Sequence, residues 1–404
     1  MKKKILFIIS TLRCGGAEHA LISLLNVMDY DKYEIDLLIL CKEGMFYKDK
    51  IPSKVNIVEP DISVSAVLEP TVNNMWKCVK YGKWKYIKMH LKRIKDERLK
   101  KEKITQNFWS EYWMKYRDYI KPLNKEYDVS IGYLEGLSNY FCIDKVSAKC
   151  KIGWMHTNYA DSNQNKKVDA LYFPKFDYMA TMSEAATETL KNEFPEIKKN
   201  IYTIHNILDE SEVQKLAEED VEEIIDKKNK FTIVSVGNIL PVKGYDMAVK
   251  ACAELVQEGI ELKWYVVGRK DQAEEIEELI RKYNLEDEFI LLGVRKNPYK
   301  YMEAADIYVQ CSRYEGFSTT IREAKLLCKP IVATNCQGIK EQIQDGVNGI
   351  LTEIDARSIY EGVHRLINDE KLRMKCTEKL KEDLKNSNEI KMELTKLYRL
   401  LDGE

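Results

Sequence analysis

Short apolar runs alternate with longer amphipathic or polar stretches along most of the chain. This alternation predicts strands that are joined by helices. The first run, Ile5–Ile9, is followed by a glycine pair, a helical pattern over Ala17–Met28 and a second run at Ile35–Leu40, which together form a β-loop-α-β unit. Later apolar runs predict further strands at Val129–Tyr133, Lys151–Trp154, Tyr178–Met182 and Ile201–Asn206.

A second series of strands begins at Phe231–Gly237, after a polar and acidic linker over residues 209–230. Strands that alternate with helices form parallel sheets with helices on both faces. The sequence therefore predicts an α/β protein with two doubly wound, Rossmann-like domains, over residues 1–205 and 206–385. The later strands of the second domain are expected at Leu262–Val267, Phe289–Leu292, Ile307–Gln310 and Ile331–Ala333.

Length and charge agree with this division and narrow the class of protein. A chain of 404 residues is long enough for two such domains. Lys and Arg number 64 against 65 Asp and Glu, so no overall field favours nucleic acid. The apolar part of Lys2–Ile9 is too short for a signal peptide, and no apolar run approaches the roughly 18 residues of a membrane span. We therefore expect a cytoplasmic protein.

Metal chemistry is not indicated by any spacing of ligand residues. The sequence shows no His/Cys cluster with zinc spacing, and its 10 cysteines are scattered. The Asp29-Tyr30-Asp31 triplet falls between a helix and a strand, where a turn is expected rather than a metal site. Neither a metal nor a cofactor is predicted.

The most informative segment is Ser312–Glu323, which contains two glutamates with seven residues between them. Glu315 precedes a predicted helix and Glu323 lies in its early turns. Backbone N–H groups at a helix N-terminus bind phosphates, and carboxylates accept hydrogen bonds from hydroxyls. Such a segment suits a nucleotide-sugar. An alternative is a capping box, in which Thr320 caps the helix and Glu323 bonds back to its backbone.

At these residues the sequence resembles glycosyltransferase family 4, whose members are retaining enzymes of the GT-B fold with a Glu-x7-Glu pair in a similar segment. The resemblance implies that Glu315 contacts the donor sugar and diphosphate and that Glu323 holds the ribose. It implies that the two domains face each other across a cleft and that a C-terminal helix over residues 386–404 returns to the first domain. The implied donor-binding backbone comprises Gly316, Phe317, Ser318 and Thr319.

Other positions match the same family pattern. Lys243, after the strand ending at Gly237, resembles the lysine that reaches the donor diphosphate. The family's usual arginine is replaced by Asn238, so one positive charge is missing unless Arg269, Arg313 or Arg322 supplies it. The remaining matches are the acceptor-side loop at Gly15 and Gly16, where Gly16 also approaches the donor, the catalytic His156, and Val294 in the loop that reads the base.

A basic, aromatic stretch lies outside the resemblance. Residues 77–103 contain twelve Lys or Arg and three acidic residues. On one helical projection, apolar side chains from Trp76 to Ile94 share a side. Two interpretations remain open: a solvated charged helix, or a surface that lies on the inner face of the cell membrane. The second predicts membrane contacts by Trp76, Lys83, Trp84, Lys88 and Lys92.

These features predict a metal-independent, retaining glycosyltransferase. Its donor is expected to be a nucleoside diphosphate sugar, with UDP as the nucleotide, and its acceptor a lipid-linked or other glycan in surface polysaccharide or glycolipid synthesis. Glu315, Lys243 and His156 are the predicted catalytic residues. Two alternatives stay open, a nucleotide-sugar epimerase of the same fold and a catalytically silent partner that binds glycans.

Overall fold

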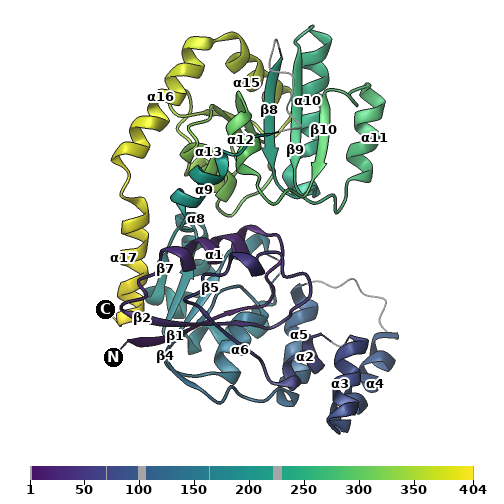
Figure 1. Cartoon of the computed structure of the whole chain (residues 1–404), viewed down its shortest axis with the longest axis vertical. Coiled ribbons are helices and arrows are strands. Elements are labelled where there is room, and N and C mark those ends of the chain that lie inside the picture. Colours follow the sequence, from purple (N-terminus) through teal and green to yellow (C-terminus); the bar gives the residue numbers. More distant parts are fainter. Residues whose placement is uncertain (1, 70, 99–105, 163, 222–229, 404) are drawn as a thin grey trace. The chain divides into compact units, whose positions relative to one another are not determined.

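Figure 1 shows the computed structural model, which describes residues 2–69, 71–98, 106–162, 164–221 and 230–403. The chain divides into two compact units. Unit 1 comprises Met1–Ile207 and Lys391–Glu404, and unit 2 comprises Leu208–Ile390. The chain therefore passes between the units twice, once near residue 207 and once near residue 390.

Unit 1 is built on a seven-stranded sheet in which every pair of neighbours is parallel. The strand order is β3-β2-β1-β4-β5-β6-β7. Its central strands are buried on both faces, as expected where helices cover a parallel sheet. The strands are β1 Lys3–Ile9, β2 Tyr33–Ile39, β3 Asn56–Val58, β4 Glu126–Gly132, β5 Ser147–Met155, β6 Tyr178–Thr181 and β7 Ile201–Thr203.

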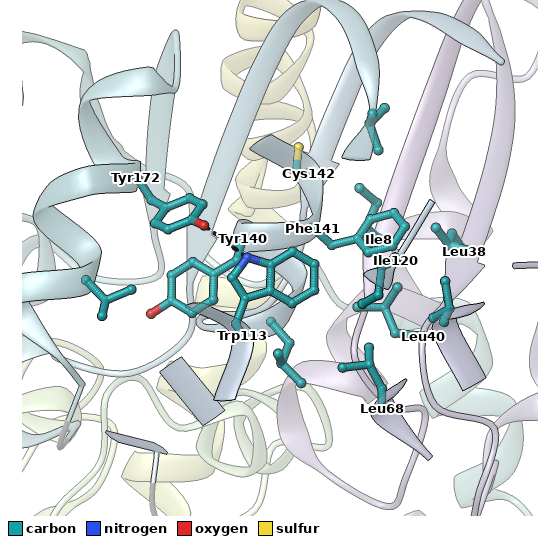
Figure 2. Packing of buried hydrophobic residues seen from close by; sticks show 14 of the residues in the cluster. Ile8, Leu38, Leu40, Leu68, Trp113, Ile120, Tyr140, Phe141, Cys142 and Tyr172 are labelled. Carbon is teal, nitrogen blue, oxygen red and sulfur yellow. Dashed lines mark hydrogen bonds between the residues drawn. The ribbon is translucent and has the colours of Figure 1, made fainter. Parts of the chain in front are cut away.

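Aromatic and aliphatic side chains pack together in the core on one side of this sheet, as Figure 2 shows. Trp113 Nε1 donates to the hydroxyl of Tyr172 at 3.0 Å, and the rings of Tyr140 and Tyr172 are 4.6 Å apart. Buried Trp and Tyr need partners for their polar atoms. Trp113 has Tyr172, Tyr172 donates to Asp144 at 2.6 Å, and Tyr140 donates to Asp169 at 2.7 Å. The helices of unit 1 are α1 Gly16–Val27, α2 Ile62–Leu68, α3 Val72–Lys80, α4 Trp84–Arg98, α5 Gln106–Tyr116, α6 Leu137–Lys145, α7 Lys166–Tyr172 and α8 Glu184–Glu193.

The last helix, α17 (Glu389–Asp402), packs on unit 1 although it is far from it in sequence. Lys3 forms an ion pair with Asp402 at 3.1 Å, and the rings of Tyr33 and Tyr398 are 5.3 Å apart. Glu393 is 2% exposed and accepts the backbone N–H of His205 at 2.8 Å. Burial alone would raise the pKa of this carboxyl, but hydrogen bonds from His205 and Lys396 hold it below its usual value.

Unit 2 contains a six-stranded parallel sheet in the order β10-β9-β8-β11-β12-β13. The strands are β8 Phe231–Val236, β9 Leu262–Val267, β10 Phe289–Gly293, β11 Ile307–Gln310, β12 Ile331–Thr334 and β13 Ile350–Thr352. The helices are α9 Glu210–Ala217, α10 Tyr245–Gln257, α11 Glu274–Tyr283, α12 Tyr299–Ala304, α13 Thr319–Leu326, α14 Gln337–Lys340, α15 Ala356–Asn368 and α16 Glu370–Asn386.

Both sheets reverse their strand order at one place. In unit 1 this switch point lies between β1 and β4, and in unit 2 it lies between β8 and β11. Ligands of doubly wound sheets bind outside the carboxyl ends of the strands at such a point. The prediction of two doubly wound, Rossmann-like sheets is confirmed, and the switch points direct attention to four loops, those after β1, β4, β8 and β11.

Candidate active site

The loop after β8 is held against the loop after β11 by the backbone itself. The N–H of Arg313 donates to the carbonyl of Val242 at 2.8 Å. Gly244 has φ +69°, and a β-carbon there would lie 2.0 Å from the carbonyl oxygen of Cys311, so only glycine fits. The short 3-10 turn Pro241–Lys243 is thereby fixed beside residues 311–315.

Lys243 and Glu315, the two residues with predicted roles at the donor, meet at this switch point. Lys243 Nζ donates to Glu315 Oε1 at 2.7 Å. The same oxygen accepts hydrogen bonds from Ser312 Oγ at 2.6 Å and Gln310 Nε2 at 2.9 Å. The side chains are 24% and 11% exposed, so the charged pair is largely shielded but still reaches the surface.

Gln310 connects this carboxylate to the helix that follows. Its Oε1 accepts the hydroxyls of Tyr308 at 2.7 Å and Thr320 at 3.0 Å, while its Nε2 donates to Glu315 and Ser312. A buried amide that uses both its donor and acceptor atoms fixes the direction of each. Neither Gln310 nor Ser312 was among the predicted site residues, because their importance depends on contacts that no short motif encodes.

The N-terminus of α13 is capped by Ser318, whose Oγ accepts the N–H of Ile321 at 3.3 Å. The capping-box interpretation, with Thr320 as the cap, is therefore wrong. Thr320 lies in the first turn and donates its hydroxyl to Gln310. Gln342 fixes the backbone of Ser318 with two hydrogen bonds of 2.9 Å. The predicted backbone residues Gly316, Phe317 and Thr319 flank this cap.

Glu323 lies one turn further along α13 and is 4% exposed. The hydroxyl of Tyr299, at the start of α12, donates to its Oε1 at 3.3 Å. Glu315 and Glu323 therefore stand in different surroundings. The first sits beside a cation at the mouth of the switch point, and the second is buried within unit 2 against a tyrosine.

Asn238 follows β8 and Val294 follows β10, the strands on either side of β9, at the same edge of the sheet. Asn238 Oδ1 accepts the N–H of Arg269 at 3.1 Å, so its carbonyl is turned toward the loop after β9. Val294 is 40% exposed and follows Gly293, whose carbonyl accepts the N–H of Gly268 at 3.1 Å. The loops after β8, β9 and β10 are thus linked by hydrogen bonds at one edge.

In unit 1, the glycine pair forms the loop between β1 and α1. Gly15 is the N-cap of α1 with an extended backbone at φ −154°, and Gly16 opens the helix. The Glu18 carboxylate folds over Gly15, where an added β-carbon would lie 2.2 Å from its Oε2. Thr11 donates to the other oxygen of Glu18 at 3.2 Å. A flexible acidic side chain therefore lies against this loop, which the sequence analysis did not anticipate.

His156 follows β5 and is held by aromatic packing. Its ring is 4.7 Å from that of Tyr133 and stacks on Trp154 at an interplanar angle of 8°. Both ring nitrogens are buried and form no hydrogen bond with the part of the chain that the structure describes. Burial lowers the pKa of the imidazole to about 3, so the ring is neutral at neutral pH. It can exchange a hydrogen bond but carries no charge.

Glu135, after β4, positions the backbone beside this histidine. Its carboxylate accepts the N–H of His156 at 2.9 Å and the hydroxyl of Thr157 at 3.1 Å. Burial raises the pKa of Glu135, against the opposing effect of these hydrogen bonds. The sequence offered only one clue to this residue, an acid directly after an apolar strand of a parallel sheet.

The basic stretch forms two helices, α3 and α4, not the single helical face that was projected from the sequence. Gly82, with φ +63°, lies in the turn between them. Large apolar side chains are nevertheless exposed on both helices: Val72 73%, Trp76 68%, Tyr81 60%, Trp84 60% and Leu91 62%. Lys88 is exposed and Lys83 half-buried, while the side chain of Lys92 lies outside what the structure describes. Among the described residues, no helix has the length and apolarity needed to span a membrane.

The turn predicted at Asp29-Tyr30-Asp31 is confirmed. Asp29 Oδ1 accepts the N–H groups of Asp31 at 3.0 Å and Lys32 at 3.2 Å. A side chain that bonds its own backbone two residues further on forms an Asx turn. No group of three or more His, Cys, Asp or Glu suited to a metal ion occurs among the residues that the structure describes.

Comparison with known proteins places the candidate site within a recognised domain. Residues 217–383 match the family model described as glycosyl transferases group 1. This segment contains the Lys243 loop, the Glu315 loop and α13. A Campylobacter jejuni enzyme named N-acetylgalactosamine-N,N'-diacetylbacillosaminyl-diphospho-undecaprenol 4-alpha-N-acetylgalactosaminyltransferase is 27% identical over 403 residues, which cover 99% of this chain and 100% of that one.

A second relative matches a smaller part of the chain. The poly(ribitol-phosphate) alpha-N-acetylglucosaminyltransferase of Staphylococcus aureus is 24% identical over 234 residues, which are 57% of this chain and 45% of that enzyme.

Solved structures agree in fold over the whole chain. An Anabaena protein in complex with UDP and glucose is similar with a TM-score of 0.69 and 16% identity, covering 100% of both chains. A mutant S. aureus structure in complex with Fondaparinux, alpha-GlcNAc-glycerol and UDP has a TM-score of 0.68 and 16% identity, covering 99% of both. At this identity the likeness establishes the fold, which is GT-B with two Rossmann-like domains.

Proposed function

We propose that this chain, a group 1 glycosyl transferase of the GT-B fold, transfers a sugar with retention of configuration from a UDP-sugar to a lipid-linked or other glycan acceptor. The product would be part of a surface polysaccharide or glycolipid. Support for the acceptor comes from the C. jejuni relative, which matches the chain end to end and is named for a diphospho-undecaprenol substrate. Support for UDP comes from the Anabaena fold neighbour, which was solved with that nucleotide.

The observation that carries the proposal is the contact between Lys243 and Glu315 in front of α13. It combines a cation, a carboxylate and the positive end of a helix at the switch point of unit 2. A cation and helix amides suit a diphosphate, and a carboxylate suits sugar hydroxyls. We assign the donor-binding role to this group together with Glu323, Val294 and Gly316–Thr319.

In the proposed reaction, the bond between the anomeric carbon and the diphosphate breaks while the acceptor oxygen bonds to the same face of that carbon. The acceptor proton passes to the leaving diphosphate, so no protein nucleophile is required. Lys243 and the amides of α13 stabilise the negative charge that develops on the leaving group. Glu315 orients the donor sugar in this proposal. The role proposed for His156 is an uncharged hydrogen bond to that sugar, because burial lowers the pKa of the imidazole to about 3.

This proposal also assigns the stabilisation of the diphosphate to protein groups without a metal. The test is to incubate the protein with a panel of UDP-sugars and a polyprenyl-diphosphate glycan, with and without a chelator, and to follow UDP release and glycolipid product. We expect an α-linked product by NMR and unchanged turnover in the chelator. Loss of turnover that Mg²⁺ or Mn²⁺ restores would refute metal independence, and a β-linkage would refute retention.

The same assay separates the two other functions. An epimerase would convert the nucleotide-sugar without any acceptor, and a silent binding partner would release no UDP with any donor. The comparisons favour neither, because the relatives described above are named as transferases. The complete Lys243–Glu315 contact also supports an active enzyme.

We further propose that α3 and α4 rest on the cytoplasmic face of the membrane and bring the enzyme to its lipid-linked acceptor. The support is the mixture of side chains on these helices. Exposed apolar groups, including Trp76 and Trp84, alternate with exposed lysines at positions 77, 80, 85 and 88. Tryptophans anchor in the interfacial region, and each lysine near an anionic surface adds about 1 kcal/mol.

Vesicle sedimentation tests this second proposal. Wild type should pellet with anionic vesicles at low salt and less at high salt, because salt screens the lysines. A variant that reverses the charge of these helices should not pellet: Lys77→Glu, Lys80→Glu, Lys85→Glu, Lys88→Glu. A matched variant that reverses four exposed lysines elsewhere should pellet like wild type: Lys167→Glu, Lys198→Glu, Lys199→Glu, Lys385→Glu. Equal pelleting of both variants would leave α3 and α4 as a solvated or partner-binding surface.

A further inference from the structure

The proposed donor site has an electrostatic deficit at Asn238. A diphosphate carries more negative charge than one lysine can balance, and Asn238 has no charge. Its carbonyl oxygen is also committed to the N–H of Arg269 at 3.1 Å.

Five arginines lie in the strand-end loops and first helix turns of unit 2: Arg269, Arg295, Arg313, Arg322 and Arg357. Arg295 already donates to the hydroxyl of Tyr301 at 3.0 Å and the carbonyl of Leu292 at 2.6 Å. Arg357 pairs with Glu254 at 2.8 Å and Glu361 at 2.9 Å. The surroundings of the other three differ.

Arg313 and Arg322 are already engaged by carboxylates. Both Nη atoms of Arg313 donate to Asp246 at 2.7 Å, in the two-pronged geometry that matches a carboxylate. Arg322 is 8% exposed and pairs with Glu389 at 2.9 Å. Its charge also acts on Glu210, whose pKa burial raises and Arg322 lowers. Binding of phosphate by either arginine would leave these carboxylates without their partner.

Arg269 is held less tightly. It forms an ion pair with Asp271 at 3.2 Å, in which the side chains are 37% and 39% exposed. An exposed ion pair of this kind contributes little to stability. Its Nε is buried and forms no hydrogen bond with the described residues. A buried guanidinium donor without a partner is costly, and an anion that accepted its proton would remove that cost.

The backbone places Arg269 beside Lys243. A β-carbon on Gly268 would lie 2.0 Å from the carbonyl oxygen of Gly237, so the loops after β8 and β9 touch only because residue 268 is a glycine. The stem of Lys243 also lies close to Gly237, with Cδ 3.8 Å from a β-carbon built on that residue. Backbone bonds from Gly237 to Val267 at 2.9 Å and from Ile239 to Arg269 at 2.8 Å fix the arrangement.

We infer that Arg269 supplies the second positive charge for the diphosphate of the nucleotide donor, in place of the uncharged Asn238. The inference rests on the proposed function and adds a binding residue to it. On donor binding, Arg269 would exchange its exposed contact with Asp271 for a phosphate oxygen. Lys243 and Arg269 would then approach the diphosphate from the loops after two neighbouring strands, β8 and β9.

Calorimetric titration of nucleosides and nucleoside diphosphates tests this inference. Wild type is first titrated with uridine, guanosine and adenosine and with UDP, GDP and ADP. The variants are then titrated with the nucleoside and the diphosphate of the base that wild type binds. Arg269→Ala should weaken diphosphate binding roughly 10-fold, the lower end of what a charge-assisted hydrogen bond contributes, because the group is partly screened. The affinity for the nucleoside should not change. Lys270→Ala, which removes the adjacent exposed lysine, should change neither.

A rescue variant makes the test decisive. Asn238→Arg in the Arg269→Ala background restores a cation at the neighbouring loop, and diphosphate affinity should recover to within about threefold of wild type. Equal loss of nucleoside and diphosphate binding would show that Arg269 only shapes the loop. Unchanged diphosphate binding by Arg269→Ala would refute the inference alone. Failure of wild type to bind any of the three diphosphates would refute the proposed function as well.

Discussion

The two units hold a predicted site residue in different ways, Glu315 at the switch point of unit 2 and His156 after β5 of unit 1. In unit 2, Glu315 receives three hydrogen bonds, one of them from a lysine. In unit 1, the ring of His156 is packed against aromatic rings, is neutral, and has no hydrogen bond within the described chain. The Glu315 carboxylate is held by directed polar contacts, whereas the His156 ring is held by burial, although Glu135 fixes the backbone beside it. A polar contact requires particular residue types at a fixed spacing, whereas a buried position can be filled by many different apolar or aromatic residues.

The largest effect is expected from removing the ion pair between Lys243 and Glu315. Lys243→Ala and Glu315→Gln should each lower kcat/KM roughly 10- to 150-fold, because a charge-assisted hydrogen bond contributes about 1.5 to 3 kcal/mol. In the double variant, kcat/KM should fall by less than the product of the two single fold-changes, because each single substitution already removes the shared contact. Steady-state donor kinetics of the three variants measure this coupling.

The result has two informative failures. Unchanged donor kinetics in Lys243→Ala would remove the lysine from the site. Strictly multiplicative losses would show that the 2.7 Å contact has no part in turnover.

Glu323→Gln should have a smaller effect on the same unit. The substitution keeps the volume and an acceptor for Tyr299 but makes the proposed ribose contact neutral. We expect nucleotide affinity to fall about 10-fold, near 1.4 kcal/mol, with the melting temperature preserved. A lowered melting temperature with unchanged affinity would assign Glu323 to the stability of α13 instead.

Gln310→Leu tests the position of the Glu315 carboxylate, because it removes a neutral hydrogen-bond donor and leaves the charges of the site unchanged. One hydrogen bond to Glu315 is lost, so we expect kcat to fall roughly 2- to 10-fold while UDP affinity is unchanged. Ser235→Ala is a suitable control, because Ser235 is also buried and accepts Trp264 Nε1 at 3.0 Å in the same sheet. If both variants lowered kcat equally, the loss would reflect stability and not the direction of Glu315.

His156→Phe tests the burial of the His156 ring through the pH dependence of the melting temperature. The folded pKa of about 3 lies below the ordinary 6.5, so the unfolded chain binds more protons between these values and stability rises with pH across that window. Above pH 6.5 this contribution is constant. The variant cannot titrate, so its melting temperature should depend less steeply on pH between 4 and 6. Parallel melting curves for the two proteins would contradict a buried, neutral His156.

The sequence was most informative where local chemistry and spacing coincide. Apolar runs predicted the central strands of both sheets, because each such strand must be apolar to lie between two helix layers. They missed the edge strands β3 (Asn56–Val58) and β13 (Ile350–Thr352), which are only three residues long. The family resemblance, together with the position of Lys243 after a predicted strand, led us to expect Lys243 and Glu315 at one site, and their contact agrees with that. Strands and short motifs of this kind are determined by residues that are close together in the sequence.

Tertiary contacts explain what the sequence did not reveal. The cap of α13 lies at Ser318, two residues before the expected Thr320, because Gln310 and Gln342 engage the neighbouring side chains and backbone. One projected helical face became two helices because Gly82 turns the chain. The contact of Asn238 with Arg269 joins residues from two different strands and has no local signature.

The position of α17 has a consequence for how the protein is made. Unit 1 contains the first residues of the chain and also Lys391–Glu404, with Lys3 paired to Asp402. Unit 2 is a single continuous segment, Leu208–Ile390. During synthesis, unit 2 can close as soon as its own segment has emerged, whereas unit 1 waits for the end of the chain. The unit whose first strands are translated first is therefore completed last, when α17 has been made.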